Sequence, residues 1–208
     1  MENRSLSAWQ TSAWLAIFVA TLLWSAVAPK EYGTWVLEVL PAVIGFGILA
    51  ATFQRFPLTP LLYWFILAHC LILMVGGHYT YAEVPLFDRI EEWLGQSRNN
   101  YDKLGHFAQG FVPALIAREI LIRRNIVNGA AWVQILSVAL CLAFSAFYEL
   151  IEWLVALLSD EAADSFLGTQ GYVWDTQSDM AWALFGAISA LVLLTRLHNR
   201  QILTVSTP

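Results

Sequence analysis

The sequence predicts an all-α membrane protein, a polytopic bundle of six transmembrane helices with one short, outward-facing amphipathic helix. The first observation behind this fold class is composition: 58% of the 208 residues are hydrophobic and only 13% are charged, whereas soluble domains average about 45–50% and about 25%. The second is a mean hydropathy of +0.58. The third is a series of apolar stretches of the length that a bilayer requires, about 20 residues. We therefore expect a single transmembrane domain over residues 1–208.

The predicted spans are separated by connections that hold helix-ending residues. The spans are expected near 8–28, 34–53, 58–76, 104–122, 131–158 and 179–197. Short connections contain residues such as Pro29, Gly33 and Pro57, which terminate helices. The first span is expected to be retained and not cleaved as a signal peptide, because its apolar stretch is too long and Pro29 would follow the cut. The long connections are 77–103 and 159–178.

The first long connection contains an amphipathic pattern. Apolar residues recur at helical spacing from Leu86 to Leu94, with acidic residues on the opposite side, and Pro85 suits the first turn of a helix. This pattern predicts a short helix that lies flat in the outer interface. Such a helix shields the bundle or covers an opening between spans.

The distribution of Lys and Arg predicts the orientation. One side of the predicted bundle carries six arginines: Arg4, Arg55, Arg123, Arg124, Arg196 and Arg200. The other side carries four basic residues: Lys30, Arg89, Arg98 and Lys103. Because basic residues concentrate in cytoplasmic loops, both termini are expected in the cytoplasm and both long connections outside. With 11 Lys and Arg against 16 Asp and Glu, the chain has no basic surplus for nucleic acid.

Several polar or sulfur-containing residues occur singly inside the spans. Glu38 and Arg118 lie near span ends, where long side chains reach the head groups. His69 is central in the third span and is expected to donate one interhelical hydrogen bond. Cys70 and Cys141 both lie in mid-span and are expected to be small buried apolar residues.

Paired polar residues distinguish the last three spans. They are Asp102, His106 and Gln109 in or before the fourth span, Glu149 and Glu152 in the fifth, and Asp175 and Asp179 at the start of the sixth. Within each span the spacing places the pair on one helical face. A rise of about 1.5 Å per residue places all three pairs in the outer third of the membrane. Because consecutive antiparallel spans are usually neighbours, these side chains are expected to meet.

Five carboxylates cannot all remain charged and unpaired in a low-dielectric environment. A divalent cation would neutralise them. The candidate metal ligands are His106, Glu149, Asp175 and Asp179, with His78 as a weaker candidate. In that case the base that activates water is Asp102 or Glu152. Alternatively, some carboxyl groups keep a proton and serve as acid–base groups or a proton relay. The structural alternative is a set of polar helix ends, with Asp175 as a helix cap.

The polar strings resemble a known family. Those carrying the resemblance are His78-Tyr79-Thr80-Tyr81, the run from Tyr101-Asp102-Lys103 through Gly105-His106 to Phe111, and a Gly168-Thr169-Gln170-Gly171 turn followed by Asp175 to Met180. They are similar to the YjdF family of bacterial inner-membrane proteins over nearly the whole chain. The resemblance implies a location in the bacterial inner membrane and a multi-pass topology, but no reaction.

A looser resemblance links Asp102, Lys103, His106 and Phe107 to the VanZ-like membrane proteins, which are associated with glycopeptide resistance. Members of that group also carry a Glu in a following span, comparable to Glu149. They often have an arginine in the final loop, whereas segment 159–178 contains no basic residue.

Three functions follow from the predicted cluster. The first is an enzyme whose His/carboxylate site, with or without a divalent metal, acts on a lipid or glycolipid head group at the periplasmic face. The second is a proton-coupled transporter that uses Glu149, Glu152 and His106 as titrating groups. The third is a non-catalytic membrane partner in which the cluster fixes helix packing. If the site is catalytic, Glu149→Gln and His106→Ala should abolish function without preventing insertion.

Overall fold

The computed structural model describes residues 5–158 and 172–205. Within them the chain forms seven helices and no strand: α1 (Ala8–Ala26), α2 (Tyr32–Thr52), α3 (Pro60–His78), α4 (Pro85–Leu94), α5 (Tyr101–Arg123), α6 (Ala130–Leu158) and α8 (Asp175–Ile202). The all-α class is therefore confirmed for the described part of the chain. The turn predicted at 168–171 lies outside the described residues.

Each predicted span coincides with a helix, and α5 and α8 begin three and four residues earlier than expected. α5 starts at Tyr101 instead of 104, and α8 starts at Asp175 instead of 179. As a result Asp102 and Asp175 lie in the first turns of helices and not in the preceding loops.

Four helices in the described residues are long and apolar enough to cross a membrane: α2, α3, α8 and the part of α6 from Ala130 to Val155. α1 and α5 are long enough, with 19 and 23 residues, but are not apolar enough to meet the same standard. In α5 the polar and charged residues His106, Gln109, Arg118 and Glu119 lower the hydropathy. The prediction of six spans therefore stays a prediction for these two helices.

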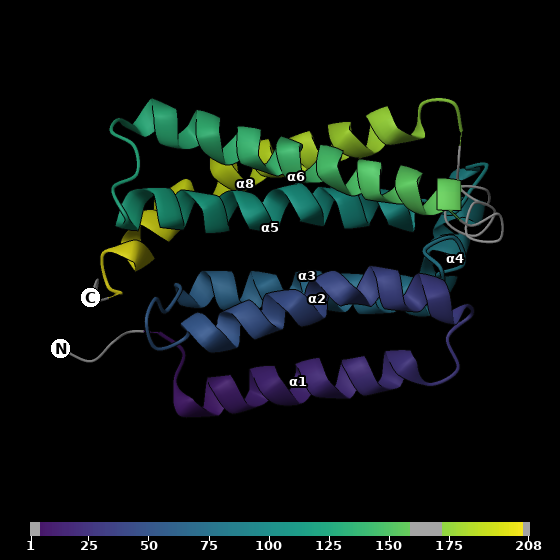
Figure 1. The fold of residues 1–208 in the computed structure, drawn as a ribbon, viewed down its shortest axis with the longest axis horizontal. Helices are drawn as coiled ribbons and strands as arrows, with labels where there is room; N and C mark the ends of the chain where they lie inside the picture. The colour runs from purple at the N-terminus through teal and green to yellow at the C-terminus, as the bar shows by residue number, and fades with distance from the viewer. Residues whose placement is uncertain (1–4, 159–171, 206–208) are drawn as a thin grey trace.

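The long helices run along a common axis (Figure 1). α1, α2 and α3 form one half of the bundle, and α5, α6 and α8 form the other. α5 is central because it packs against α3, α6 and α8. Both termini lie at one end of the bundle and α4 lies at the other.

The contact between α5 and α8 is a close approach of two backbones. A Cβ atom at Gly110 would lie 1.7 Å from the carbonyl oxygen of Ala183, and one at Gly186 would lie 2.1 Å from that of Phe107. Small residues permit such proximity between membrane helices. These two glycines therefore determine how closely the charged side chains of α5 and α8 meet.

The short helix α4 is present where the amphipathic pattern predicts it. It starts with Pro85 at its first position and ends at Gly95, whose φ of 62° is left-handed. Its apolar residues Leu86 and Trp93 are 64% and 84% exposed, as suits a helix in contact with lipid head groups. Phe87 packs on Tyr101 of α5, with ring centroids 5.0 Å apart, which is consistent with a shielding role.

Two polar contacts outside the spans organise the same end of the molecule. The Glu31 carboxylate caps α2 and accepts a hydrogen bond from the Gly33 backbone at 2.7 Å. Hydrogen bonds from the Thr34 hydroxyl and from the Thr34 and Gly33 backbones lower the pKa of Glu31, against a smaller opposing effect of burial. Lys30 pairs with Glu83 at 2.8 Å, and that hydrogen-bonded carboxylate raises the pKa of Lys30.

The turn after α3 has an unusual backbone. Thr80 and Tyr81 both have positive φ angles, 56° and 57°, a conformation that non-glycine residues rarely adopt. The Tyr81 ring lies against Gly76 and Gly105, where a Cβ atom would come within 2.3 and 2.9 Å of it. The turn thus inserts a tyrosine between α3 and α5 beside the predicted cluster.

A second buried polar network lies at the end of the bundle near the termini. The Glu119 carboxylate accepts hydrogen bonds from the Thr59 hydroxyl at 2.8 Å, from the Thr59 backbone N–H at 3.1 Å and from Arg123 at 2.7 Å, and it also lies 2.9 Å from His198 Nε2. Arg118 bonds Asn199 and lies 3.2 Å from His198 Nδ1. The expectation that Arg118 reaches the phosphates is therefore wrong, because its guanidinium is occupied by α8.

Candidate functional site

Lys103 ties α5 to the start of α8. Its Nζ atom lies 2.9 Å from Asp175 Oδ1, donates to Asp179 Oδ1, and is 3.6 Å from Asp102 Oδ2. Arg98 also contacts Asp175, with Nη2 3.0 Å from the same oxygen. Asp175 and Asp179 therefore already have cationic partners, and Lys103 is the counter-charge of the cluster.

His106 lies at the centre of the acidic groups and is 6% exposed. Its Nε2 atom is 3.2 Å from Asp102 Oδ1, one helical turn earlier, and 3.8 Å from Asp179 Oδ2. Its Nδ1 atom is 3.1 Å from Gln109 Oε1 and 3.9 Å from Glu149 Oε1. A proton on Nδ1 that is donated to Gln109 directs Nε2 toward the two aspartates.

Three of these residues could hold a metal ion. One ligand atom each from Asp102, His106 and Asp179 lie within 4.8 Å of one another. Tetrahedral coordination with bonds of about 2.1 Å separates ligand atoms by about 3.4 Å, close to the 3.2 and 3.8 Å from His106 Nε2 to the two carboxylates. Lys103 contacts the other oxygen of each carboxylate and would hold both in position.

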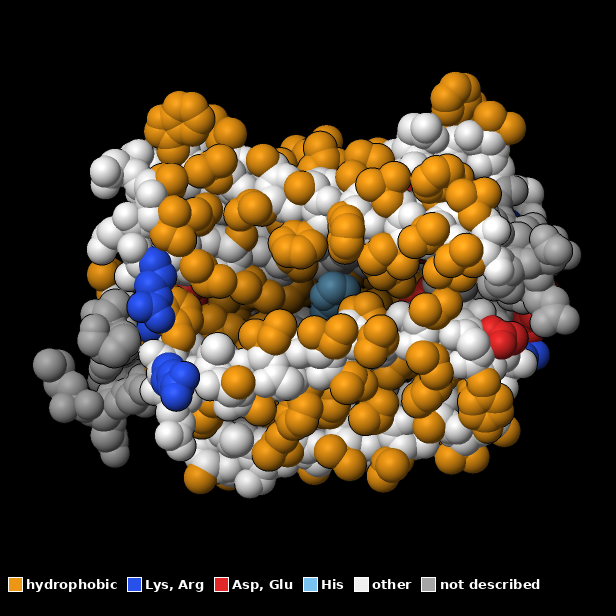
Figure 2. Space-filling model, viewed as in Figure 1, with side chains coloured by type: hydrophobic (Ala, Val, Ile, Leu, Met, Phe, Trp, Pro, Cys, Tyr) orange, Lys and Arg blue, Asp and Glu red, His pale blue; other side chains and the backbone are white. Residues whose placement is uncertain are grey.

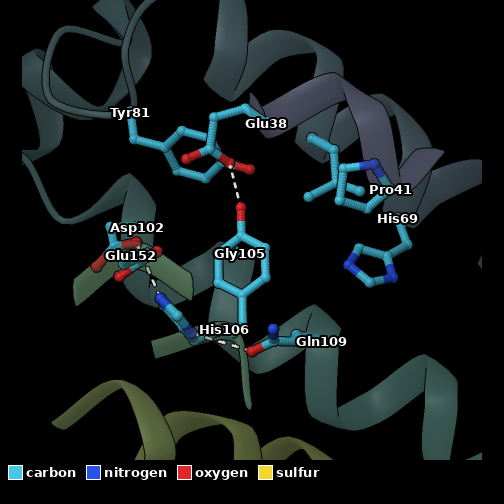
Figure 3. Close-up of a pocket in the computed structure, with 11 residues that line it drawn as sticks. Glu38, Pro41, His69, Tyr81, Asp102, Gly105, His106, Gln109 and Glu152 are labelled. Atoms are coloured by element: carbon cyan, nitrogen blue, oxygen red, sulfur yellow. Dashed lines mark hydrogen bonds and ion pairs between the residues drawn. The ribbon is translucent and has the colours of Figure 1, made fainter. Parts of the chain in front are cut away.

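A polar cavity of about 90 Å³ adjoins His106 (Figure 3). Its lining comes from α2, α3, α5, α6 and the turn after α3: Glu38, Pro41, His69, Leu73, Tyr81, Asp102, Gly105, His106, Gln109, Tyr148 and Glu152. The hydroxyl of Tyr148 donates a hydrogen bond to Glu38 Oε2, at 3.2 Å, so two lining residues from α6 and α2 are joined. The cavity has room for water or part of a small head group beside the imidazole.

Two residues of this cavity differ from their expected roles. Glu38 is 9% exposed and accepts a hydrogen bond from the Tyr148 hydroxyl, so the expectation that its side chain reaches the head groups is wrong. His69 has no hydrogen-bond partner among the described residues, so the expected interhelical bond is absent there. An acid within an apolar span is itself a signal of function, and at Glu38 that signal could have identified the site.

The acidic residues outnumber the cations. The cluster and its cavity contain six carboxyl groups, those of Glu38, Asp102, Glu149, Glu152, Asp175 and Asp179. Among the described residues, Lys103 and Arg98 are the lysine and arginine that contact them. Because isolated ionised carboxylates are costly in a buried site, the arrangement requires either a bound cation or protons on some carboxyl groups.

The structure brings most of the predicted site residues together. Glu149 is 7% exposed, and its Oε1 atom has no hydrogen-bond partner in the described part of the chain. Glu152 lines the cavity. Of the predicted metal ligands, His106 and Asp179 belong to the group of three whose ligand atoms lie within 4.8 Å of one another. The third member of that group is Asp102, and Glu149 and Asp175 are not part of it.

His78 lies apart from the cluster. Its Nδ1 atom is 3.0 Å from the Ser25 carbonyl oxygen, and its ring packs on Trp24 with centroids 4.5 Å apart. These contacts connect α3 to α1, so the geometry gives His78 a role in packing. Cys70 and Cys141 are free and buried as expected.

The chain is similar to known membrane proteins whose descriptions give no reaction. A family model described as "Predicted membrane protein (DUF2238)" matches residues 11–200. The chain is 54% identical over 181 residues to "Inner membrane protein YjdF" of Escherichia coli (strain K12), an alignment that covers 87% of each protein. No solved structure matches the chain significantly.

Proposed function

Because the chain belongs to the DUF2238 family of membrane proteins, we propose that this inner-membrane protein acts on the head group of a lipid or glycolipid at the outer face of the bilayer. The site is the group Asp102, His106 and Asp179 with its adjoining cavity. The observation that carries the proposal is the proximity of these three ligand atoms, within 4.8 Å, with His106 and Asp179 buried and Asp102 partly buried. Intramembrane ionisable residues that gather in this way usually mark function.

The proposed chemistry is metal-assisted or acid–base attack of water on a head-group ester. A divalent ion held by Asp102, His106 and Asp179 would polarise the ester and bind the attacking water. The Glu152 carboxylate, which lines the cavity, would accept the proton of that water and return it to the oxygen of the leaving group as the ester bond breaks. Without a metal, His106 would act as the general base, with Asp102 orienting its ring.

The proposed topology has six spans with both termini in the cytoplasm. α1 has 19 residues and α5 has 23, lengths of about 28 and 35 Å at 1.5 Å per residue, comparable to a hydrocarbon core of about 30 Å. The charges of α5 are paired inside the bundle, with Asp179 at one end and with Glu119 and Asn199 at the other. Paired and inward-facing charges are compatible with a membrane helix.

The metal hypothesis is tested by elemental analysis of the purified protein. After removal of metal and reloading with Zn²⁺ or Mn²⁺, the wild-type protein should hold about one ion per chain, whereas Asp179→Asn and His106→Ala should hold less than about a tenth of that amount, because each removes one of three ligands. His78→Ala is the matched control, since this histidine lies on Ser25 and Trp24. Equal metal content in all four proteins would contradict the ligand assignment.

The reaction is tested by mass spectrometry of lipids incubated with the protein in vesicles of bacterial lipid extract. Wild-type protein and His78→Ala should release a head-group product, and His106→Ala and Glu152→Gln should release none although they insert normally. Product formation by metal-free wild-type protein that still depends on His106 would support the acid–base form. Undiminished product from His106→Ala would end the catalytic proposal.

A proton-coupled carrier is the second candidate. It is favoured by the polar side chains that continue inward from the cluster, namely Glu38, Tyr148 and the unpaired His69. In proteoliposomes with an entrapped pH indicator, a carrier would move protons down a gradient and Glu152→Gln would stop this movement. A protein without proton movement, metal or product would instead be a packing partner.

A further inference from the structure

A large apolar groove runs along the bundle between α2 and α6. Its volume is about 870 Å³. Figure 2 shows this hollow between the two halves of the molecule, with hydrophobic walls and a histidine at its floor. Its lining includes the buried Cys70 and Val112 and the exposed Ile48, Phe144 and Phe147. The groove therefore opens sideways, where the spans would meet the hydrocarbon of the bilayer.

The groove is continuous with the polar cavity beside His106. Five residues line both spaces: Pro41, His69, Leu73, Gln109 and Tyr148. At this junction the Tyr148–Glu38 hydrogen bond joins α6 to α2. The combined space thus has a long hydrocarbon-lined part and a short part lined with acids and imidazole, which matches the two parts of an amphiphile.

The length of the groove matches a lipid chain. On α5 its lining extends from Gln109 to Leu121, about 18 Å at 1.5 Å per residue. Half of a hydrocarbon core of about 30 Å is about 15 Å. One extended acyl chain therefore fits along the groove with its polar end at Gln109.

We propose that this groove binds one hydrocarbon chain of a membrane lipid, entering sideways between α2 and α6, so that the head group lies in the cavity beside His106. The inference rests on the proposed function and specifies its substrate as a lipid bound by its chain. A helix of another protein is a less suitable occupant, because its apolar face would cover His69 and Gln109 without bonding them, and burying unpaired polar groups is unfavourable.

Two glycines of α2 allow a matched test. Gly45 lines the groove, and a Cβ atom there would meet nothing within 4 Å. Gly47 is equally unobstructed but does not belong to the groove lining. Gly45→Leu should therefore fill the groove without a clash, and Gly47→Leu should add the same side chain outside it. Because each buried methylene contributes about fourfold to affinity, displacing two or more should weaken chain binding by about tenfold or more.

The experiment uses full-length protein in vesicles of bacterial phospholipid that contain a phosphatidylethanolamine with a photoreactive diazirine in its acyl chain. Mass spectrometry then locates the labelled peptides. Wild-type protein and Gly47→Leu should be labelled on the groove-lining faces of α2, α3, α5 and α6, and Gly45→Leu should lose about nine-tenths of that labelling. Equal labelling of the two leucine variants, or labelling spread over all lipid-facing helices, would overturn the proposal.

His106→Ala separates this inference from the proposed function. If this variant keeps groove labelling and wild-type protein forms no head-group product, the groove binds lipid and the proposed reaction fails. If product forms with wild-type protein and with Gly45→Leu at the same rate, the reaction stands and the groove assignment fails.

Discussion

At the scale of single residues, Lys103 is the side chain on which the cluster most depends. Its side chain is 10% exposed and contacts Asp102, Asp175 and Asp179. Removal of one partner from a buried charge pair leaves the other uncompensated, at a cost of about 3–5 kcal/mol. We expect Lys103→Met to lower the free energy of unfolding in detergent by about 3 kcal/mol, and Lys103→Met with Asp179→Asn to recover part of the loss.

The control at this scale is Lys30→Met. The Lys30–Glu83 pair has a comparable distance of 2.8 Å, but its side chains are 53% and 55% exposed, and exposed pairs contribute little. Its denaturation midpoint should match that of the wild-type protein. A Lys103→Met midpoint equal to that of Lys30→Met would show that the Lys103 contacts are not stabilising.

At the scale of elements, the approach of α5 to α8 positions both halves of the proposed metal group. Gly110→Ala would place a methyl group against the Ala183 backbone, which cannot move as a flexible side chain does. Overpacking of this kind costs about 1–3 kcal/mol. We expect a lower thermal midpoint and weaker metal binding, because Asp179 would move away from Asp102 and His106.

Gly47→Ala is the matched control, since a Cβ atom at Gly47 meets nothing within 4 Å. Replacing glycine by alanine in a helix is favourable by up to about 1 kcal/mol, so this variant should be as stable as the wild-type protein or slightly more so. If Gly110→Ala also behaves in this way, the close approach of the helices does not hold the cluster together.

Helical periodicity predicts the elements and much of the cluster, but not the partners. Helical spacing predicts that Asp102 lies beside His106 and that Asp175 and Asp179 share a face. In the structure Asp102 contacts His106, and Asp175 and Asp179 both contact Lys103. Periodicity does not specify how a helix is rotated against distant segments. For this reason the contacts of Glu38 with Tyr148, 110 residues apart, and of Arg118 with Asn199, 81 residues apart, were not foreseen.

At the scale of the whole molecule, both termini lie at the end that carries the Glu119 network, opposite α4 and the His106 cluster (Figure 1). The proposed six spans would produce this arrangement, and the Arg-rich loops predict that the terminal end faces the cytoplasm. A cysteine introduced at exposed Gln96 should react with a membrane-impermeant maleimide in intact cells stripped of their outer membrane. A cysteine at exposed Arg200 should react only after the inner membrane is opened.

The native cysteines should add no background labelling to this measurement, because Cys70 and Cys141 are both buried. The unsubstituted protein should give no signal before denaturation. Labelling of the Arg200 position in sealed cells would reverse the proposed orientation and place the His106 cluster on the cytoplasmic side.

The polar ties between α5 and α8 have a mechanical consequence. These two helices are fastened near one end by Lys103 with Asp179 and near the other by Glu119 with His198. If one helix slid past the other by a single residue, about 1.5 Å, both of these contacts would lengthen at once. We therefore expect these two helices to move as one unit, and any opening that admits or releases a molecule to occur between α2 and α6, which the hydrogen bond between Glu38 and Tyr148 joins.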